Sequence, residues 1–486
     1  MSNKNVFYVF CSLCFVYVIP SLISGFYYND DMFRSVIGYY GWNGDGRPLS
    51  DYVYKFISTK PVLPDYFPLP IALSLVAYSY ISIRIAKNIF HIQSYAAIFI
   101  ALSIITNPFF ASNLWYRYDS FFMVMSVCMA IAPFSFNKER TIVWVVSTFL
   151  LLMSLSLYQA SIALFIIISS IEMTISFSKN ILSTKNILLR LLRRFLSFLF
   201  SIIIYFKIVM PLTDTGYYFN DFNKIIHPSL DGLHKLIENY KNAYSYMWEI
   251  TNSPLLYPIL LAMIIFIVSC VSLFFKSHRR IEFTISMLIT MLMSILFSPG
   301  VSMFSENPSF MPRVYIGFGG FILFITSIIV ISFSDCNTSK NIKRISYCVL
   351  VYFYFSIFAF FYSATNANNE EFNNKTALAN RIVSVLDTLN LSNSNVLFFD
   401  GEPPKSHAVQ INKLVYPFSE VMVLTTFSSG YDGGRFMLMR AGMRDIEYPS
   451  NEVRQMILSL SKDSIPVFKN NVFSVYRIDN VTLIKF

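Results

Sequence analysis

Residues 6–24, VFYVFCSLCFVYVIPSLIS, form a nearly unbroken apolar run near the start of the chain. A helix of about 20 such residues is long enough to cross a bilayer. Lys4 precedes the run and no small-residue cleavage pattern lies before Phe26, so we interpret the run as a retained signal anchor. The composition agrees, because 55% of residues are hydrophobic and 14% are charged, whereas soluble domains carry about a quarter charged residues. The sequence therefore predicts a polytopic membrane protein.

Apolar runs of similar length recur along the chain and predict about eleven transmembrane helices. These runs are residues 6–24, 67–86, 95–112, 120–136, 141–157, 160–177, 195–212, 254–275, 283–298, 314–333 and 345–363. The close pair within 141–177 is alternatively one re-entrant hairpin. The predicted fold class is a polytopic all-α membrane protein with a small C-terminal α/β domain.

Charged residues divide between the two sides of the predicted bundle. The connections on one side, such as 178–194 and 276–280, are rich in Lys and Arg, whereas those on the other side, such as 25–66 and 213–253, hold most acids. Positive residues favour the cytoplasmic side, so we expect a cytoplasmic N-terminus and, after eleven spans, an outer C-terminus. The net charge of +10 is then mostly orienting charge and gives no reason to expect nucleic acid as a partner.

Residues 364–486 differ from the rest of the chain in their pattern of apolar and polar residues. Residues 395–400, 420–427, 472–478 and 481–486 have strand patterns, and residues 377–390 and 451–461 have helical periodicity. We therefore predict two domains, a transmembrane domain over 1–363 and an outer α/β domain over 364–486. In the transmembrane domain the first outer loop, 25–66, is the predicted catalytic loop.

The stretch YYNDDMFR, residues 27–34, places two carboxylates directly after the first predicted span. One reading is a helix cap by Asn29 or Asp30. A cap explains one acid but not both, because adjacent side chains point apart. A carboxylate at the membrane boundary also loses hydration, which raises its pKa and makes it a better base. Asp30 and Asp31 are therefore candidate catalytic residues, with Arg34 as a nearby substrate-binding cation.

Two further stretches bring aromatic and charged residues to the same side. In GWNGDGRPLS, residues 41–50, Trp42 and Arg47 suit a sugar ring and its charged groups, although a plain loop is the alternative. In NLWYRYDS, residues 113–120, an aromatic belt at the membrane boundary with Arg117 extending to the surface is one interpretation. This interpretation does not account for Asp119, because an acid at the end of a span is costly unless it is paired or functional. We therefore include Asp119 among the candidate catalytic residues.

Polar interruptions of two later runs supply the remaining candidates. Tyr158 and Gln159 in SLYQAS, residues 156–161, line a cavity or form a tight turn. Glu306 and Arg313 in SENPSFMPRVY, residues 305–315, reach the outer boundary, where Arg313 binds a lipid phosphate or anchors the chain. We identify no metal-ligand set and no nucleotide-binding motif.

The acidic pair after the first span, followed by GYYGWNGDGRPL at residues 38–49, resembles the serotype-converting O-antigen glucosyltransferases of enteric bacteria and their phages. These belong to the membrane glycosyltransferases of the GT-C fold, which use polyprenyl-phosphate sugars. The specific signal covers residues 29–49, and the predicted spans over 1–363 agree with it.

The resemblance implies transfer of glucose from undecaprenyl-phosphate-glucose to a lipid-linked O-antigen repeat on the periplasmic face of the bacterial inner membrane. It also implies a donor-lipid flippase and a bactoprenol glucosyltransferase as functional partners. The first outer loop of the superfamily supplies the catalytic acid, here Asp30 or Asp31. Such a base serves a single inverting displacement, and the departing phosphate needs a cation: Arg47, Arg117, Arg313 or a divalent metal ion.

Two other classes remain open at this point. An O-antigen polymerase, or another enzyme of lipid-linked oligosaccharides, would rely more on arginines of the outer loops than on an acid pair. A transporter of lipid-linked sugars would place charges within its spans and use broken helices. The clustering of acids at the outer boundary favours the glucosyltransferase.

Overall fold

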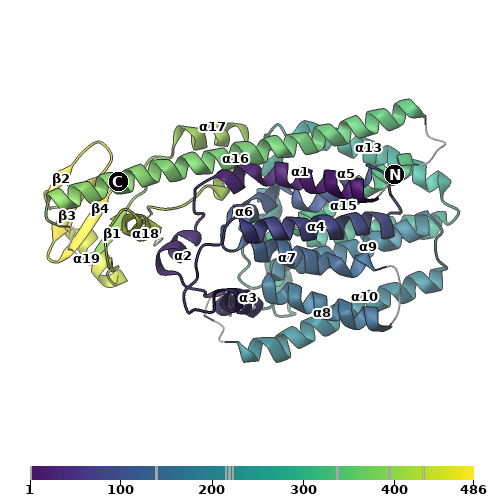
Figure 1. Cartoon of the computed structure of the whole chain (residues 1–486), viewed down its shortest axis with the longest axis horizontal. Helices are drawn as coiled ribbons and strands as arrows, with labels where there is room; N and C mark the ends of the chain where they lie inside the picture. Colours follow the sequence, from purple (N-terminus) through teal and green to yellow (C-terminus); the bar gives the residue numbers. More distant parts are fainter. Residues whose placement is uncertain are drawn as a thin grey trace.

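The computed structural model describes residues 3–136, 141–213, 216, 221, 224–334, 339–391, 396–428, 431 and 433–486. The apolar runs form a bundle of helices lying side by side (Figure 1). Its helices are α1 Asn3–Ile23, α4 Leu69–Asn88, α5 Ala97–Ile105, α6 Ala111–Trp115, α7 Ser120–Ile131, α8 Thr141–Leu157, α9 Ile162–Ser178, α10 Thr184–Ile204, α13 Leu256–Lys276, α14 Arg280–Phe297, α15 Gly317–Ser334 and α16 Lys340–Thr388.

The number of membrane-length helices is smaller than the eleven predicted spans. Among the described residues, eight helices are long and apolar enough to cross a membrane, or up to nine if the bent pair 97–105 and 108–115 is one span. The segments 120–135 and 141–157 are apolar helices but shorter. The chain is thus mostly helical and compatible with a multi-pass membrane protein, and a count of eleven is not confirmed.

Burial separates central helices from helices at the rim of the bundle. The most apolar window is 83% buried in the helix at 159–178 and 78% buried in α15, but only 22% buried in α14. Apolar side chains exposed around the rim fit contact with lipid rather than water. The start of α15 approaches the end of α14 closely, because a Cβ on Gly317 would lie 1.8 Å from the Phe297 carbonyl oxygen.

Helix α16 is 49 residues long and joins the bundle to the C-terminal domain without a break. It runs along one edge of the bundle, where Tyr17 of α1 packs on Phe361, and continues to the small sheet (Figure 1). The predicted boundary between residues 363 and 364 therefore falls inside a continuous helix.

The C-terminal domain has a four-stranded sheet in the order β1-β4-β3-β2. β1 pairs in parallel with β4, and the other pairs are antiparallel. Its elements are β1 Leu397–Asp400, α17 His407–Val415, α18 Gly433–Arg440, α19 Asn451–Leu460, β2 Phe468–Lys469, β3 Ser474–Ile478 and β4 Val481–Lys485. The hairpin predicted from the last residues is confirmed as β3 and β4.

The strand predicted at 420–427 is wrong. Its first part belongs to a 3-10 helix, η10 Pro417–Met422. The following backbone groups bond to side chains instead of a sheet: Leu424 N donates to Asn368 Oδ1, and Thr425 N donates to Asn29 Oδ1. This segment therefore links the C-terminal domain to α16 and to the first loop.

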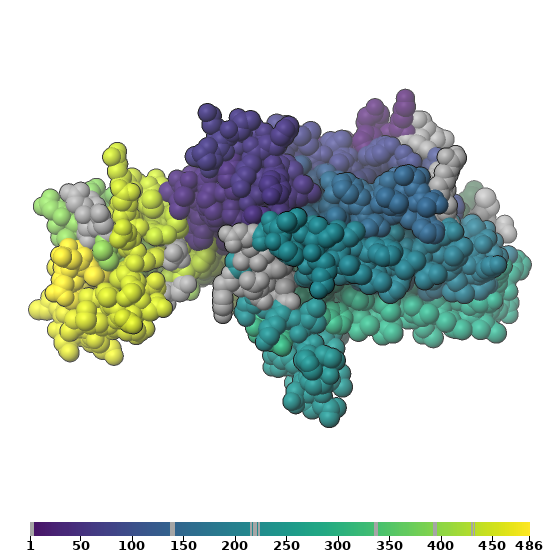
Figure 2. All heavy atoms as spheres, turned by 90° about the horizontal axis from the view of Figure 1, so that it is seen from below, coloured from purple at the N-terminus to yellow at the C-terminus, as the bar shows by residue number. Residues whose placement is uncertain are grey.

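The bundle has two ends of opposite character, which we call the acidic end and the basic end. The acidic end carries the first loop, with α2 Asp31–Ile37, η1 Trp42–Asp45 and α3 Pro48–Ser58, and later η4 Gln159–Ser161, α12 Leu230–Trp248 and η8 Val301–Phe304. The basic end carries the last turn of α4 and the first turns of α10 and α14; parts of the expected basic connections, 137–140 and 335–338, lie outside the described residues. The yellow C-terminal domain lies against the purple first loop at the acidic end (Figure 2).

Candidate active site

Asp30 lies at the N-cap position of α2 with its side chain partly open to solvent. Among the described residues its carboxylate makes no capping hydrogen bond, so the cap reading does not account for it. Its side chain is 41% exposed, and its Oδ2 lies 3.7 Å from Nη1 of Arg313. The same Nη1 donates a 2.6 Å hydrogen bond to the hydroxyl of Tyr116. Asp30 is therefore accessible and faces one well-anchored cation.

Asp31 is fully buried and is held by backbone groups. Its carboxylate accepts hydrogen bonds from the amides of Tyr28 at 3.2 Å, Arg117 at 2.7 Å and Tyr118 at 3.3 Å. Burial raises the pKa of Asp31 well above its usual range and the nearby Asp119 adds to this, while the N–H groups oppose it. Asp31 therefore ties the start of α2 to the segment before α7.

Asp119 is buried between two arginines of the first loop. Its Oδ2 accepts a 3.0 Å hydrogen bond from Arg34 Nη1, and its Oδ1 lies 3.6 Å from Arg47 Nη1. The indole Nε1 of Trp42 also donates to Oδ1. The carboxylate is neutralised inside the protein, which suits a positioning group better than a proton acceptor.

Arg34 and Trp42 lie in the interior rather than on an open surface. The guanidinium of Arg34 stacks 4.2 Å from the ring centroid of Trp42, and only 4% of the residue is exposed. Trp42 is 0% exposed and packs on Tyr54 and Phe122. The expected aromatic platform for a sugar is thus covered, and both residues contact the site through Asp119.

A cavity of about 350 Å³ opens beside Arg313, and we call it the acidic-end cavity. Its polar part includes Arg47, Tyr158 and Arg313, and the Arg47 guanidinium lies 4.5 Å from the ring centroid of Tyr158. Its body is apolar, with lining side chains from α8, α9 and α10 and from the segment after α14. The apolar lining includes Leu155, Ile162, Phe198, Ile202, Phe206 and Val314.

Gln159 and Tyr205 hold the turn that carries Arg47. Gln159 Nε2 donates to the carbonyl oxygens of Asp45 at 3.2 Å and Gly46 at 3.0 Å, and the Tyr205 hydroxyl donates to the Gly46 carbonyl at 2.7 Å. Asp45 itself lines the acidic-end cavity, and burial raises its pKa. This turn is therefore fixed against the bundle at the mouth of the cavity.

Two predicted site residues lie to the side of this arrangement. Arg117 forms an ion pair with Asp65, with an Nη2–Oδ2 distance of 3.0 Å, and its backbone rather than its side chain contacts Asp31. Glu306 pairs with Lys224 at the surface. Neither residue lines the acidic-end cavity as described.

The C-terminal domain forms one wall beside α2. The Tyr28 hydroxyl donates to the Met422 carbonyl at 3.0 Å, and Arg440 Nη1 donates to the Ser35 hydroxyl at 2.9 Å. The rings of Phe33 and Phe436 pack with their centroids 4.5 Å apart. Access to Asp30 is therefore bounded by a domain that follows it by almost 400 residues.

The model of the glucosyl transferase GtrII family matches residues 19–324, which include the first loop and every candidate residue named above up to Arg313. The chain belongs to the GtrII glucosyl transferase family. It is also 30% identical over 418 residues to an uncharacterized 55.3 kDa protein in the gtrB 5′ region of Salmonella phage P22, with 83% of each chain covered. No solved structure matches the chain.

Family membership confirms the resemblance that the sequence indicated and supports a glycosyltransferase activity. For the GtrII chain, the site geometry adds three residues that sequence reasoning did not single out: Asp45, Tyr116 and Tyr205. Tyr205 interrupts an apolar run, which is a weak signal; the other two lie in stretches examined for different residues. Among the described residues, no group of three or more His, Cys, Asp or Glu side chains is placed to hold a metal ion.

Proposed function

We propose that this GtrII chain transfers glucose from undecaprenyl-phosphate-glucose to a sugar of a lipid-linked O-antigen repeat. The observation that carries the proposal is the position of Arg313, which lines the acidic-end cavity and also lies 3.7 Å from Asp30. One residue thus connects a place for an anionic, lipid-linked donor with an accessible carboxylate. Membership of a glucosyltransferase family supports the sugar.

The acidic-end cavity matches an amphiphilic donor. Arg47 and Arg313 present cationic groups to the donor phosphate, since guanidinium groups bind phosphate through paired hydrogen bonds. The apolar side chains Phe198 and Ile202 of α10, with Phe206 just after it, provide a surface for the first isoprene units. A divalent ion remains the alternative partner of the phosphate, and transfer measured in EDTA-treated membranes tests it.

Asp30 is the proposed base. Asp31 and Asp119 are engaged with buried donors of the protein, whereas Asp30 is 41% exposed beside the mouth of the cavity. In the proposed step the acceptor hydroxyl attacks the anomeric carbon of glucose and its proton passes to Asp30. The bond from that carbon to the phosphate oxygen breaks, and undecaprenyl phosphate leaves with its charge facing Arg47 and Arg313. A single displacement inverts the anomeric configuration.

The proposed orientation places the N-terminus in the cytoplasm and the acidic end with residues 364–486 in the periplasm of the inner membrane. A flippase that delivers the donor lipid and a bactoprenol glucosyltransferase that makes it are then the expected functional partners. Alkaline phosphatase fused after Phe486 should be active, and a cytosolic fluorescent reporter there should be dark. The reverse result would overturn the orientation and the periplasmic reaction together.

The activity is tested by comparing lipopolysaccharide from cells with and without the gene. Mass spectrometry of the O-antigen repeat should show one added hexose only when the gene and a donor-lipid supply are both present. A gene-dependent change in chain length without added glucose would instead identify a polymerase. An unchanged repeat and chain length would leave the glucosyltransferase proposal without support.

A further inference from the structure

Three tyrosine hydroxyls from different segments of the chain lie close to the acid pair of the first loop. The Tyr28 hydroxyl donates to the Met422 carbonyl oxygen at 3.0 Å, and the Tyr116 hydroxyl accepts a 2.6 Å hydrogen bond from Arg313 Nη1. The hydroxyl oxygen of Tyr431 is also buried, yet no residue that the structure describes makes a hydrogen bond to it. Two of these hydroxyls therefore have a partner within the protein, and that of Tyr431 differs from them.

Tyr431 belongs to the C-terminal domain and reaches across to α2. Its ring packs on the ring of Phe33, with the two centroids 5.5 Å apart. Phe33 follows Asp30 by three positions at the start of α2, so these two side chains lie on the same side of the helix. A Cβ on Gly433 would lie 2.5 Å from Cε1 of Tyr431, so the glycine leaves room for the ring. The phenol is thus held beside Asp30 by contacts from both domains.

The charges around Tyr431 agree with this position. Burial raises the pKa of Tyr431 and the charge of Asp30 raises it further, whereas the charge of Arg313 opposes both effects. The phenol therefore stays protonated and can both donate and accept a hydrogen bond next to the accessible carboxylate. The same part of the C-terminal domain is anchored at the neighbouring residue of the first loop, because Thr425 N donates to Asn29 Oδ1 at 3.2 Å.

A buried hydroxyl without a hydrogen-bond partner is costly, because it has lost its contacts with water. A phenylalanine at position 431 would pack on Phe33 without that cost. The hydroxyl of Tyr17 also has no partner among the described residues, but Tyr17 packs on Phe361 inside the bundle, where packing is a sufficient role. The hydroxyl of Tyr431 instead lies beside the proposed base, where the acceptor must approach.

We propose that the Tyr431 hydroxyl binds the acceptor sugar through a hydrogen bond to the hydroxyl adjacent to the one that Asp30 deprotonates. The inference rests on the proposed function and assigns part of acceptor recognition to the C-terminal domain. Tyr431 as a residue is partly exposed, so a small turn of its ring brings the covered hydroxyl to the acceptor. It does not line the acidic-end cavity as described, which keeps its role apart from donor binding.

The test uses the purified full-length protein in lipid nanodiscs. The probe is the lipid-linked O-antigen repeat extracted from a host strain that lacks the gene. Equilibrium binding of the repeat gives its Kd, transfer at saturating donor gives kcat and the acceptor KM, and thermal unfolding without acceptor gives the Tm.

Tyr431→Phe is compared with two other tyrosine variants that lose the same hydroxyl group. Tyr17→Phe is the matched control, because it removes a buried hydroxyl that is likewise unpaired among the described residues but lies inside the bundle. Tyr28→Phe removes a hydroxyl that is bonded across the contact between the first loop and the C-terminal domain. It therefore shows what a purely structural loss at this contact does to the Tm.

Tyr431→Phe should weaken binding of the repeat about fivefold and raise the acceptor KM by a similar factor, because one hydrogen bond to the acceptor is lost. The donor KM should not change. The Tm of Tyr431→Phe without acceptor should equal or exceed that of the wild type, because no hydrogen bond to a described residue is lost. Tyr17→Phe should bind the repeat as the wild type does, and Tyr28→Phe should have a lower Tm.

An unchanged Kd and acceptor KM in Tyr431→Phe would overturn the proposal. A Tm that falls together with binding, as expected for Tyr28→Phe, would give Tyr431 a structural role and would overturn it as well. If the wild type does not bind the repeat, the acceptor site is wrong. If the wild type binds the repeat more tightly than Tyr431→Phe but transfers no glucose, the acceptor site stands and the proposed transfer fails.

Discussion

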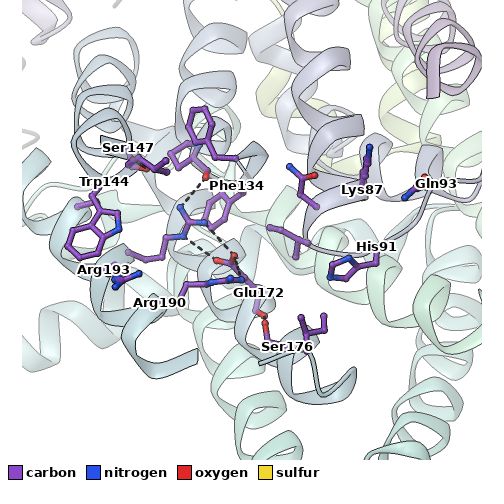
Figure 3. Close-up of a pocket in the computed structure, with 18 residues that line it drawn as sticks. Lys87, His91, Gln93, Phe134, Trp144, Ser147, Glu172, Ser176, Arg190 and Arg193 are labelled. Atoms are coloured by element: carbon purple, nitrogen blue, oxygen red, sulfur yellow. Dashed lines mark hydrogen bonds and ion pairs between the residues drawn. The ribbon is translucent and has the colours of Figure 1, made fainter. Parts of the chain in front are cut away.

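The two ends of the bundle use the same residue types in opposite proportions. At the acidic end three carboxylates, Asp30, Asp31 and Asp119, lie near Arg34, Arg47 and Arg313, and Asp30 keeps 41% of its side chain exposed. At the basic end Glu172 of α9 is enclosed by Arg190 and Arg194 of α10 (Figure 3). The acidic end thus keeps an accessible carboxylate, whereas the carboxylate described at the basic end is paired and buried.

This difference teaches that the exposure of a charged side chain, rather than its presence, indicates which groups of a boundary site can meet a substrate. Paired charges hold helices and loops in place, as Asp119 and Glu172 do, because breaking such pairs leaves a buried charge. Asp30 differs from both, because 41% of its side chain is exposed.

The largest expected effect comes from removing the accessible acid. Asp30→Asn keeps the size of the side chain but removes the proton acceptor, so transfer should fall about 10²–10⁴-fold at unchanged membrane level. The measurement is glucosylation of the O-antigen, normalised to protein amount by immunoblot. Asp31→Asn is the matched variant and should retain more activity than Asp30→Asn. Equal, near-normal transfer by both would remove the acid pair from the reaction and make Asp119 the next candidate.

The next effect concerns the cations of the acidic-end cavity. Arg313→Lys and Arg47→Lys keep the charge but lose the planar fork, so at least one should reduce transfer about tenfold. Arg117→Lys is the control, because Arg117 is paired with Asp65 away from the cavity. If all three variants transfer glucose normally, the donor phosphate is bound elsewhere or by a metal ion.

A smaller effect on stability should depend on pH through Asp31. Because its pKa is raised in the folded protein, folding favours its protonated form; that contribution is fully present below the unfolded pKa of about 3.9 and is lost as pH rises. Asp31→Asn cannot titrate, so its Tm minus that of the wild type should increase between pH 5 and pH 8 (about these limits). Any hydrogen bonds lost in the variant change its Tm by the same amount at every pH, so they do not affect the slope. A difference that is flat or decreases with pH contradicts the direction given for Asp31.

The smallest effect is expected at the surface of the acidic end. Glu306→Gln removes a partly exposed partner of Lys224 that lies outside the described cavity, so transfer should stay at the wild-type level. The assay is the same O-antigen measurement at matched protein amount. A clear loss of transfer would extend the site to Glu306 and would weaken the contrast between accessible and paired charges.

Much of the bundle was predictable because long apolar runs are a strong and local signal. The count of eleven spans is not confirmed, since α7 has 12 residues and α8 has 17, fewer than the roughly 20 of a typical span. The strand expected at 420–427 failed for a related reason. Side chains of Asn29 and Asn368, distant in sequence, bond the backbone that a sheet would have used.

The candidate residues were predictable one by one, but their pairing was not. Asp30 and Arg313 were both identified as boundary charges, yet 283 positions separate them and only the folded chain brings them to 3.7 Å. Trp42 was expected to bind a sugar ring, but the loop closes around it and leaves 0% of the residue exposed. Sequence shows which groups are available, while partners and exposure are properties of the tertiary structure.

The unbroken helix α16 has a geometric consequence for the acceptor. Its 49 residues extend about 74 Å, more than twice the roughly 30 Å hydrocarbon core, so its outer half is a rigid spacer. One residue inserted there would turn the C-terminal domain by about 100° and raise it by about 1.5 Å, separating Met422 and Thr425 from the first loop. The position of the C-terminal domain beside the first loop is thus determined by the rotation and rise of α16. In the proposed reaction, the room for the acceptor sugar would therefore depend on the number of residues in a segment that supplies none of the candidate catalytic side chains.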